Sequence, residues 1–143
     1  MKGNIDRVKE LENVLLTYEK PSVYFKELRE NKNLELDFPE IYDLIGVIQS
    51  PIHHPEGDVF NHTMMVIDEA AKLKNKAKNP LGFMYSALCH DFGKVLTTTT
   101  KEDGRIISYN HERAGLKLVR KFLNRTTKIE QLKKKITILE NMY

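Results

Sequence analysis

The sequence predicts an all-α fold, a single compact bundle of about seven helices, on two observations. Apolar residues recur at helical spacing in nearly every segment, and residues that favour helix starts precede several of these segments. Strand-like alternation is confined to a small hairpin expected around Asp103-Gly104. At 143 residues, the chain has the length of one domain with a sizeable core.

The expected elements divide the single domain into three parts. Residues 1–50 hold the N-terminal helices: one from Ile5 to about Leu15, one capped by Ser22, and one that starts at Pro39 and ends before Pro51. Residues 51–125 hold three helices: 59–74 after a cap at Asp58, 80 to the pair at 90–91 after a cap at Asn79, and 111 to about 124 after a cap at Asn110. Residues 126–143 form a last helix, which begins with the capping box Thr127–Glu130.

The composition excludes several classes of protein. No stretch approaches the roughly 18 apolar residues of a membrane span, and the charged N-terminus lacks the apolar core of a secretory signal. The single cysteine, Cys89, cannot form an internal disulfide and is expected to pack in the core. These features favour a cytoplasmic protein without membrane contact.

A metal site is the first functional hypothesis. All five histidines lie between positions 53 and 111, and the pair His90-Asp91 follows an apolar segment in ALCHDFGK. Gly93 would end the helix there, so that both side chains reach one ion, with His62 as the natural third ligand. The plainer alternative is a helix end at which Asp91 pairs with Lys94. The residues by themselves leave both interpretations open.

Three longer motifs favour the metal site over the helix end: HPEGDVFNHTMMVIDEA, ALCHDFGK and NHERAG. Together they resemble the HD-domain superfamily of metal-dependent phosphohydrolases, in particular the HD domain in the C-terminal half of bacterial tRNA nucleotidyltransferases (CCA-adding enzymes). The upstream segments RVKELENVLL, PSVYFKELRE and LDFPEIYDLIGVIQSP are similar to that family too. The resemblance extends from about Arg7 to Leu139.

The resemblance implies a role for each matching residue. It implies three metal ligands, three catalytic residues and a group that lines the substrate cleft: His62, His90 and Asp91 for the metal; Asp91, Lys94 and His111 for catalysis; His54, Glu56, Asp58 and Lys94 for the substrate. Lys94 would neutralise phosphate charge, and His111 would bind a second ion or the substrate phosphate. Asp58 is equally well explained as a helix cap, and His53 matches no family position and is expected at the surface.

The resemblance also implies an activity. This is a phosphatase or 2′,3′-cyclic phosphodiesterase that acts on nucleotides or RNA ends with a divalent ion: Mn, Ni, Co, Fe, Zn or Mg. The chain departs from the family pattern twice. These 143 residues include no segment that resembles a nucleotidyltransferase head, and ITILENMY stands where a closing aspartate is expected. A three-ligand site completed by water or substrate, a degenerate site and a truncated chain all remain open explanations.

A basic stretch supports an alternative function. Between positions 112 and 135 only two glutamates oppose nine cationic residues: Arg113, Lys117, Arg120, Lys121, Arg125, Lys128, Lys133, Lys134 and Lys135. Such a face would attract an RNA backbone, so a degenerate HD domain that binds tRNA or another RNA without turnover is the alternative. An ordinary solvated helix face is the plainer explanation, and a third hypothesis is assembly through the last helix.

Overall fold

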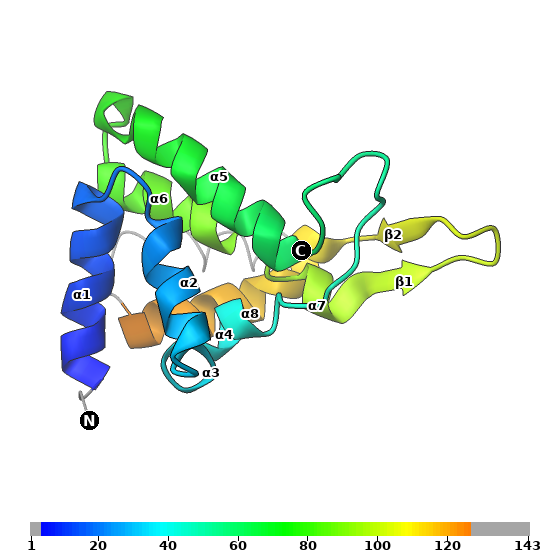
Figure 1. Cartoon of the computed structure of the whole chain (residues 1–143), viewed down its shortest axis with the longest axis horizontal. Coiled ribbons are helices and arrows are strands. Elements are labelled where there is room, and N and C mark those ends of the chain that lie inside the picture. The colour runs from blue at the N-terminus through cyan, green and yellow to red at the C-terminus, as the bar shows by residue number, and fades with distance from the viewer. Residues whose placement is uncertain (1–3, 127–143) are drawn as a thin grey trace.

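The computed structural model describes residues 4–126, and the predicted last helix lies outside them. The described elements follow one another along the chain (Figure 1): α1 (Asn4–Thr17), α2 (Ser22–Glu30), α3 (Leu34–Asp37), α4 (Pro39–Tyr42), α5 (Val59–Leu73), the 3-10 turn η1 (Lys74–Lys76), α6 (Pro80–Cys89), α7 (Lys94–Thr97), β1 (Thr98–Thr100), β2 (Ile106–Ser108) and α8 (His111–Thr126). The prediction of an all-α fold is confirmed. The predicted small hairpin is also present, with β1 antiparallel to β2 and Gly104 in the turn between them at φ 87°.

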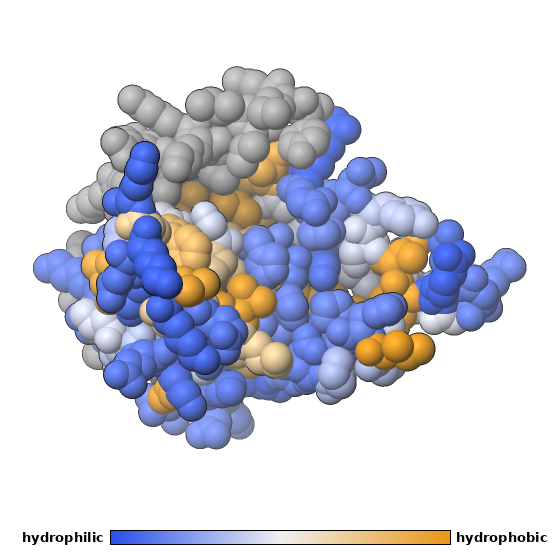
Figure 2. Space-filling view, turned by 90° about the horizontal axis from the view of Figure 1, so that it is seen from above, coloured by the Kyte–Doolittle hydropathy of each residue, from blue (hydrophilic) through white to orange (hydrophobic). Residues whose placement is uncertain are grey.

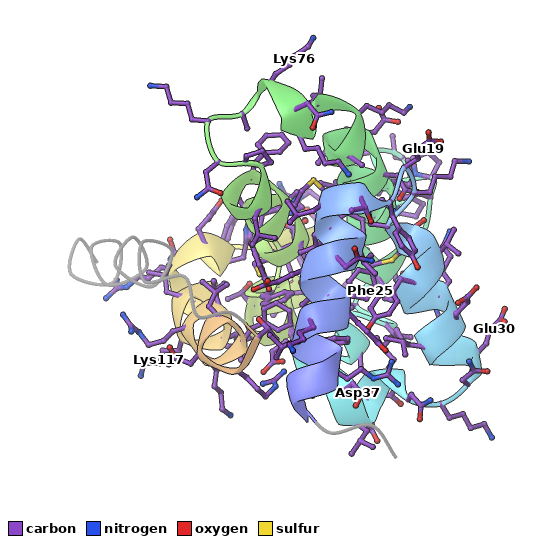
Figure 3. All side chains as sticks on the ribbon, turned by 90° about the vertical axis from the view of Figure 1, so that its left-hand side faces the viewer. Glu19, Phe25, Glu30, Asp37, Lys76 and Lys117 are labelled. Carbon is purple, nitrogen blue, oxygen red and sulfur yellow. The ribbon has the colours of Figure 1, made fainter. Side chains whose placement is uncertain are left out.

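An aromatic series forms the centre of the core. Phe38 packs edge-on against Phe25 with ring centroids 6.0 Å apart, and Phe122 of α8 contacts both Phe38 and Phe92 at 6.2 and 5.3 Å. All four rings are at most 1% exposed, so each removes a large apolar area from water. In Figure 3, the labelled Phe25 lies among the packed helices. Phe92 matters for function, because it fixes in the core the turn that directly follows α6.

Two of the predicted helix caps are confirmed and one is wrong. The carboxylate of Asp58 accepts a hydrogen bond from the Asn61 N–H at 2.8 Å, and the Asn79 amide oxygen accepts one from the Gly82 N–H at 3.0 Å. Ser22, in contrast, is the first residue of α2 and does not cap it. Its N–H and hydroxyl donate to Asp68 of α5 at 3.0 and 2.6 Å, so the N-terminus of α2 is capped by another helix.

The segment after α4 folds back onto the start of α5. The helix predicted from Pro39 ends at Tyr42, earlier than expected, and the chain turns at Gly46 with φ 83°. The Gly46 N–H donates to Asp58 at 2.8 Å, and the Val59 N–H donates to the Val47 carbonyl at 2.9 Å. These bonds place the HPEG sequence beside the first turn of α5.

The basic face of α8 is smaller than the sequence predicts. Arg125 donates to the carboxylate of Glu40 on α4 at 3.1 Å, and Glu40 is only 7% exposed. Arg125 therefore joins α4 to α8, because a buried carboxylate needs a charged partner. Arg113, Lys117 and Lys121 are exposed, and in Figure 3 Lys117 lies at the outer side of α8.

The surface has a mixed character. In the face of the molecule that Figure 2 shows, the coloured surface is mostly hydrophilic, with hydrophobic residues in separate patches. Within residues 4–126, no helix is both long enough and apolar enough to cross a membrane.

Candidate metal centre

Asp91 is the centre of the candidate site, and three segments of the chain converge on it. Its Oδ2 atom lies 3.0 Å from His90 Nε2 and 3.7 Å from His62 Nε2 of α5. The same atom is 3.4 Å from Lys94 Nζ at the start of α7, and Oδ1 is 3.3 Å from His111 Nε2 at the start of α8. All the predicted metal and catalytic residues therefore meet at one carboxylate, which is 3% exposed.

The close approach of α7 and α8 brings His111 to Asp91. A Cβ atom added to Gly93 would lie only 1.7 Å from the His111 carbonyl oxygen, and one added to Gly115 would lie 2.8 Å from the Gly93 nitrogen. Gly93 does not terminate α6, contrary to the sequence prediction. The helix ends earlier, at Cys89, and the φ of Gly93, −66°, is open to any residue. Gly93 and Gly115 are needed for the backbone contact.

Each histidine around Asp91 has one ring nitrogen held by an acceptor. His62 Nδ1 lies 2.7 Å from Glu56 Oε2, His90 Nδ1 lies 2.8 Å from the Ala87 carbonyl, and His111 Nδ1 lies 3.1 Å from the Ser108 carbonyl. Because these oxygens only accept hydrogen bonds, Nδ1 carries the proton in each ring. When the rings are neutral, their Nε2 lone pairs face an anionic carboxylate, and a cation between them stabilises this arrangement. Without such a cation, burial would lower the pKa of His90, but its contacts with Asp91 raise it.

The charge state of Asp91 is also suited to binding a cation. Burial would raise the pKa of Asp91, but His90, Lys94 and His111 outweigh burial and lower it to about 2, so the carboxyl is ionised at neutral pH. Its buried Oδ2 atom makes no well-aligned hydrogen bond among the described residues, although His90 Nε2 and Lys94 Nζ lie 3.0 and 3.4 Å from it. The Lys94 ammonium group partly offsets the charge of this oxygen, and a metal ion bound here would contact it directly.

Two groups of side chains have the spacing of metal ligands, and they share His62. In each group the ligand atoms lie within 4.8 Å of one another: one consists of His62, His90 and Asp91, the other of His54, Glu56 and His62. A neutral imidazole has one lone pair and can bind one ion only. Since the proton of His62 is on Nδ1 and faces Glu56, the lone pair on Nε2 is available to an ion held by the group that contains Asp91.

Glu56 and His54 lie beside His62 in the candidate site, whereas Asp58 binds backbone N–H groups outside it. Hydrogen bonds from the Glu56 N–H and from His62 and His54 lower the pKa of Glu56 to about 2, and burial of the carboxyl opposes the change. Both oxygens of Asp58 accept hydrogen bonds from backbone N–H groups, at Asn61 and Gly46. The geometry thus supports the capping alternative for Asp58.

A cavity of about 280 Å³ adjoins the centre, between the 48–54 segment and the hairpin. Its lining includes the predicted residues His54, Lys94 and His111, and also Gln49 and His53. The sequence analysis missed Gln49, which accepts a hydrogen bond from Lys94 Nζ at 3.1 Å and is 9% exposed. An isolated glutamine in a loop carries no sequence signal for this role. His53 is exposed as expected, but it lies at this cavity.

Cys89 is buried in the core, as predicted, and does not belong to either ligand group. Burial raises the pKa of its thiol, so the thiol stays protonated and is a poor metal ligand. The candidate centre therefore consists of imidazole and carboxylate groups.

Comparison with known proteins places these residues in a family. The profile of the HD domain matches residues 59–141. The Multifunctional CCA protein of Actinobacillus pleuropneumoniae serotype 5b is 44% identical over 105 residues, which are 73% of this chain and 25% of that protein. The corresponding protein of Mannheimia succiniciproducens is 38% identical over 122 residues, 85% of this chain and 28% of the relative.

A third relative, the Multifunctional CCA protein of Methylococcus capsulatus, is 44% identical over 96 residues, 67% of this chain and 21% of that protein. The chain thus spans about a quarter of the length of the curated relatives it matches. No solved structure matches it. Since the HD profile covers more than half of the sequence and includes His62, His90, Asp91 and His111, the chain belongs to the HD domain family.

Proposed function

We propose that this domain is a divalent-metal-dependent phosphohydrolase, of the phosphatase or 2′,3′-cyclic phosphodiesterase type, that acts on nucleotides or RNA ends. The observation that carries the proposal is the buried, ionised Asp91, whose Oδ2 lies 3.0 and 3.7 Å from the Nε2 atoms of two histidines. Membership of the HD domain family supports the same chemistry. The relatives named CCA proteins support a nucleotide or RNA substrate.

His62, His90 and Asp91 are the residues that would hold the ion. Two imidazoles and one carboxylate suit Mn, Fe, Co, Ni or Zn, and suit Mg less well. A bound divalent ion lowers the pKa of a coordinated water and polarises a phosphoryl oxygen. The three ligands leave coordination positions for water and substrate, as catalytic sites require.

Lys94 and His111 act on the substrate side in this proposal. Gln49 and Asp91 hold the Lys94 ammonium group between them, at 3.1 and 3.4 Å, next to the cavity. A fixed cation there offsets the negative charge that develops on a phosphoryl group. His111 lines the same cavity, and we assign it to the substrate phosphate. The cavity of about 280 Å³ suits a small ligand or a chain end.

The proposal predicts hydrolysis that depends on the ion and on Lys94. With Mn²⁺, Co²⁺ or Ni²⁺ we expect turnover of p-nitrophenyl phosphate or of a 2′,3′-cyclic nucleotide, its loss after chelation with EDTA, and its return when the metal is restored. Lys94→Met should lower kcat/KM about 100-fold, because a preorganised charge is lost, while Mn²⁺ affinity measured by calorimetry changes only a few-fold. Activity that survives chelation, or a fully active Lys94→Met variant, would refute this assignment.

A second candidate function, RNA binding along α8, rests on a separate observation. Arg113, Lys117 and Lys121 are exposed at intervals of four residues and therefore share one face of the helix. Arg125 pairs with Glu40, whereas no carboxylate within residues 4–126 pairs with any of these three cations. A row of three cations of this kind would follow a phosphate backbone.

Neutralising this row should weaken RNA binding in a salt-dependent way. For a variant with Arg113→Gln, Lys117→Gln and Lys121→Gln, we expect fluorescence anisotropy with labelled tRNA to show a lower affinity and a slope of log K against log[salt] that is less steep by about two. Lys76→Gln is the control, since Lys76 lies away from Lys117 in Figure 3. Equal slopes for the wild type and the triple variant would exclude this face as the RNA contact.

A further inference from the structure

We propose that Glu56 is a positioning residue, which uses one carboxylate oxygen to fix the tautomers of both His62 and His54 and thereby presents His62 Nε2 to the metal. The inference rests on the proposed function for the identity of the bound group. It replaces the sequence expectation that Glu56 itself contacts the substrate.

The contacts of a single oxygen carry the inference. Glu56 Oε2 lies 2.7 Å from His62 Nδ1 and 3.1 Å from His54 Nδ1. A carboxylate only accepts hydrogen bonds, so both Nδ1 atoms are protonated and both rings offer their lone pairs on Nε2. The two rings are packed edge to face with centroids 5.1 Å apart, which further limits their rotation. Glu56 therefore determines which nitrogen of His62 is available as a ligand.

The short distance between Glu56 and His62 favours an orienting role over direct ligation. Two ligand atoms about 2.1 Å from one tetrahedral ion are about 3.4 Å apart. His62 Nε2, at 3.7 Å from Asp91 Oδ2, is near this value and beyond hydrogen-bond length, whereas the 3.0 Å between His90 Nε2 and the same oxygen also fits a hydrogen bond. The 2.7 Å between Glu56 Oε2 and His62 Nδ1 is instead a hydrogen-bond length. Metal-bound histidines commonly have such an acceptor on the second ring nitrogen.

The turn that carries Glu56 is itself held firmly. Its carbonyl accepts a hydrogen bond from the Asn61 side chain at 3.0 Å, and the next residue, Gly57, has a φ of 110° that favours glycine. Gln49 donates to the Gly57 carbonyl at 3.3 Å. The Glu56 side chain is 12% exposed. Because the turn is supported in this way, the carboxylate keeps one position relative to both imidazoles.

Glu56 Oε2 contacts both a proposed metal ligand, His62, and a residue that lines the cavity, His54. His54 lines the cavity of about 280 Å³, and its Nδ1 is held by Glu56, so Nε2 is the ring nitrogen left for a substrate group. Loss of the Glu56 carboxylate should therefore disturb a metal ligand and a cavity residue at once.

The test compares Glu56→Ala and Glu56→Gln in the full chain. Long-range ¹H–¹⁵N NMR of the metal-free protein, at a pH where the imidazoles are neutral, reports the tautomer of His62, and Co²⁺ titration reports affinity. We expect the Nδ1–H tautomer in the wild type and both tautomers in Glu56→Ala, with a Co²⁺ affinity about 10- to 100-fold lower. Glu56→Gln keeps an accepting oxygen and should retain most of the wild-type behaviour. Glu69→Ala on α5 is the control, because Glu69 contacts Lys72 at the surface.

Two outcomes would overturn the inference. One is an unchanged His62 tautomer and an unchanged affinity in Glu56→Ala. The other is a Glu56→Gln variant that loses as much affinity as Glu56→Ala while His62 keeps its tautomer in both, which would make Glu56 a ligand. The NMR measurement needs neither metal nor turnover. If the wild type binds no ion, the proposed function fails, while the tautomers still decide the role of Glu56.

Discussion

Replacing Asp91 with asparagine is expected to abolish tight binding of a divalent ion and to lower metal-dependent hydrolysis about 1,000-fold or more. The amide is almost isosteric with the carboxylate but is neutral, so it removes the charge on which His62, His90 and Lys94 converge. Transition-state stabilisation by the ion and by Lys94 is then lost together. Calorimetry with Mn²⁺ and steady-state kinetics measure the two losses.

The same substitution has an expected effect in the absence of metal. The pKa of Asp91 falls from 3.8 to about 2 on folding, so the ionised form stabilises the folded state above about pH 4, and this contribution is lost as the pH falls towards 2. At neutral pH, Asp91→Asn should therefore lower the free energy of unfolding by about 2 kcal/mol. Asp103→Asn, in the exposed hairpin turn, is the control. An Asp91→Asn variant that binds Mn²⁺ as tightly as the wild type would contradict the assignment.

Replacing Gly93 with alanine is expected to have the largest effect on the fold. The added methyl group would lie 1.7 Å from the His111 carbonyl oxygen and 2.7 Å from the Gly115 nitrogen. Both are backbone atoms and cannot rotate away, so α8 must shift relative to α7. Because strained overpacking typically costs about 1–3 kcal/mol, and backbone yields less than side chains, we expect a loss of about 3 kcal/mol or more in urea unfolding.

The shift of α8 should also separate His111 from Asp91. Gly104→Ala is the matched control: Gly104 lies in the hairpin turn with φ 87° and has nothing within 4 Å of the new Cβ, so only local strain of about 1 kcal/mol is expected. The Gly93→Ala variant should lose hydrolytic activity at temperatures where it is still folded, whereas Gly104→Ala should keep it. Equal stability of the two variants would contradict the close-packing role of Gly93.

Local sequence patterns predicted most of the helices because their determinants lie within a few residues. Asp58 and Asn79 cap the helices that directly follow them, and such contacts can be inferred from sequence. The capping of α2 could not be inferred in this way, because its partner, Asp68, is 46 residues distant from Ser22. Arg125 gave a misleading signal for the same reason, since its partner Glu40 is 85 residues away.

The candidate site shows the same limit. The pair His90-Asp91 alone favoured a helix end over a metal site, and the spacing to His62 and His111 became informative through the resemblance to the HD-domain superfamily. The precise contacts come from long-range packing: Gly93 against Gly115, and Gln49 against Lys94. Neither contact has a local sequence signature, because a loop glutamine and a glycine near a helix end have many ordinary explanations.

The most direct test of this account is anomalous X-ray scattering from crystals of the protein grown with Mn²⁺ or Co²⁺. The account predicts one strong peak bounded by His62 Nε2, His90 Nε2 and Asp91 Oδ2, at metal–ligand distances from all three atoms. A peak between His54 and Glu56 instead, or no peak near Asp91 at saturating metal, would contradict it.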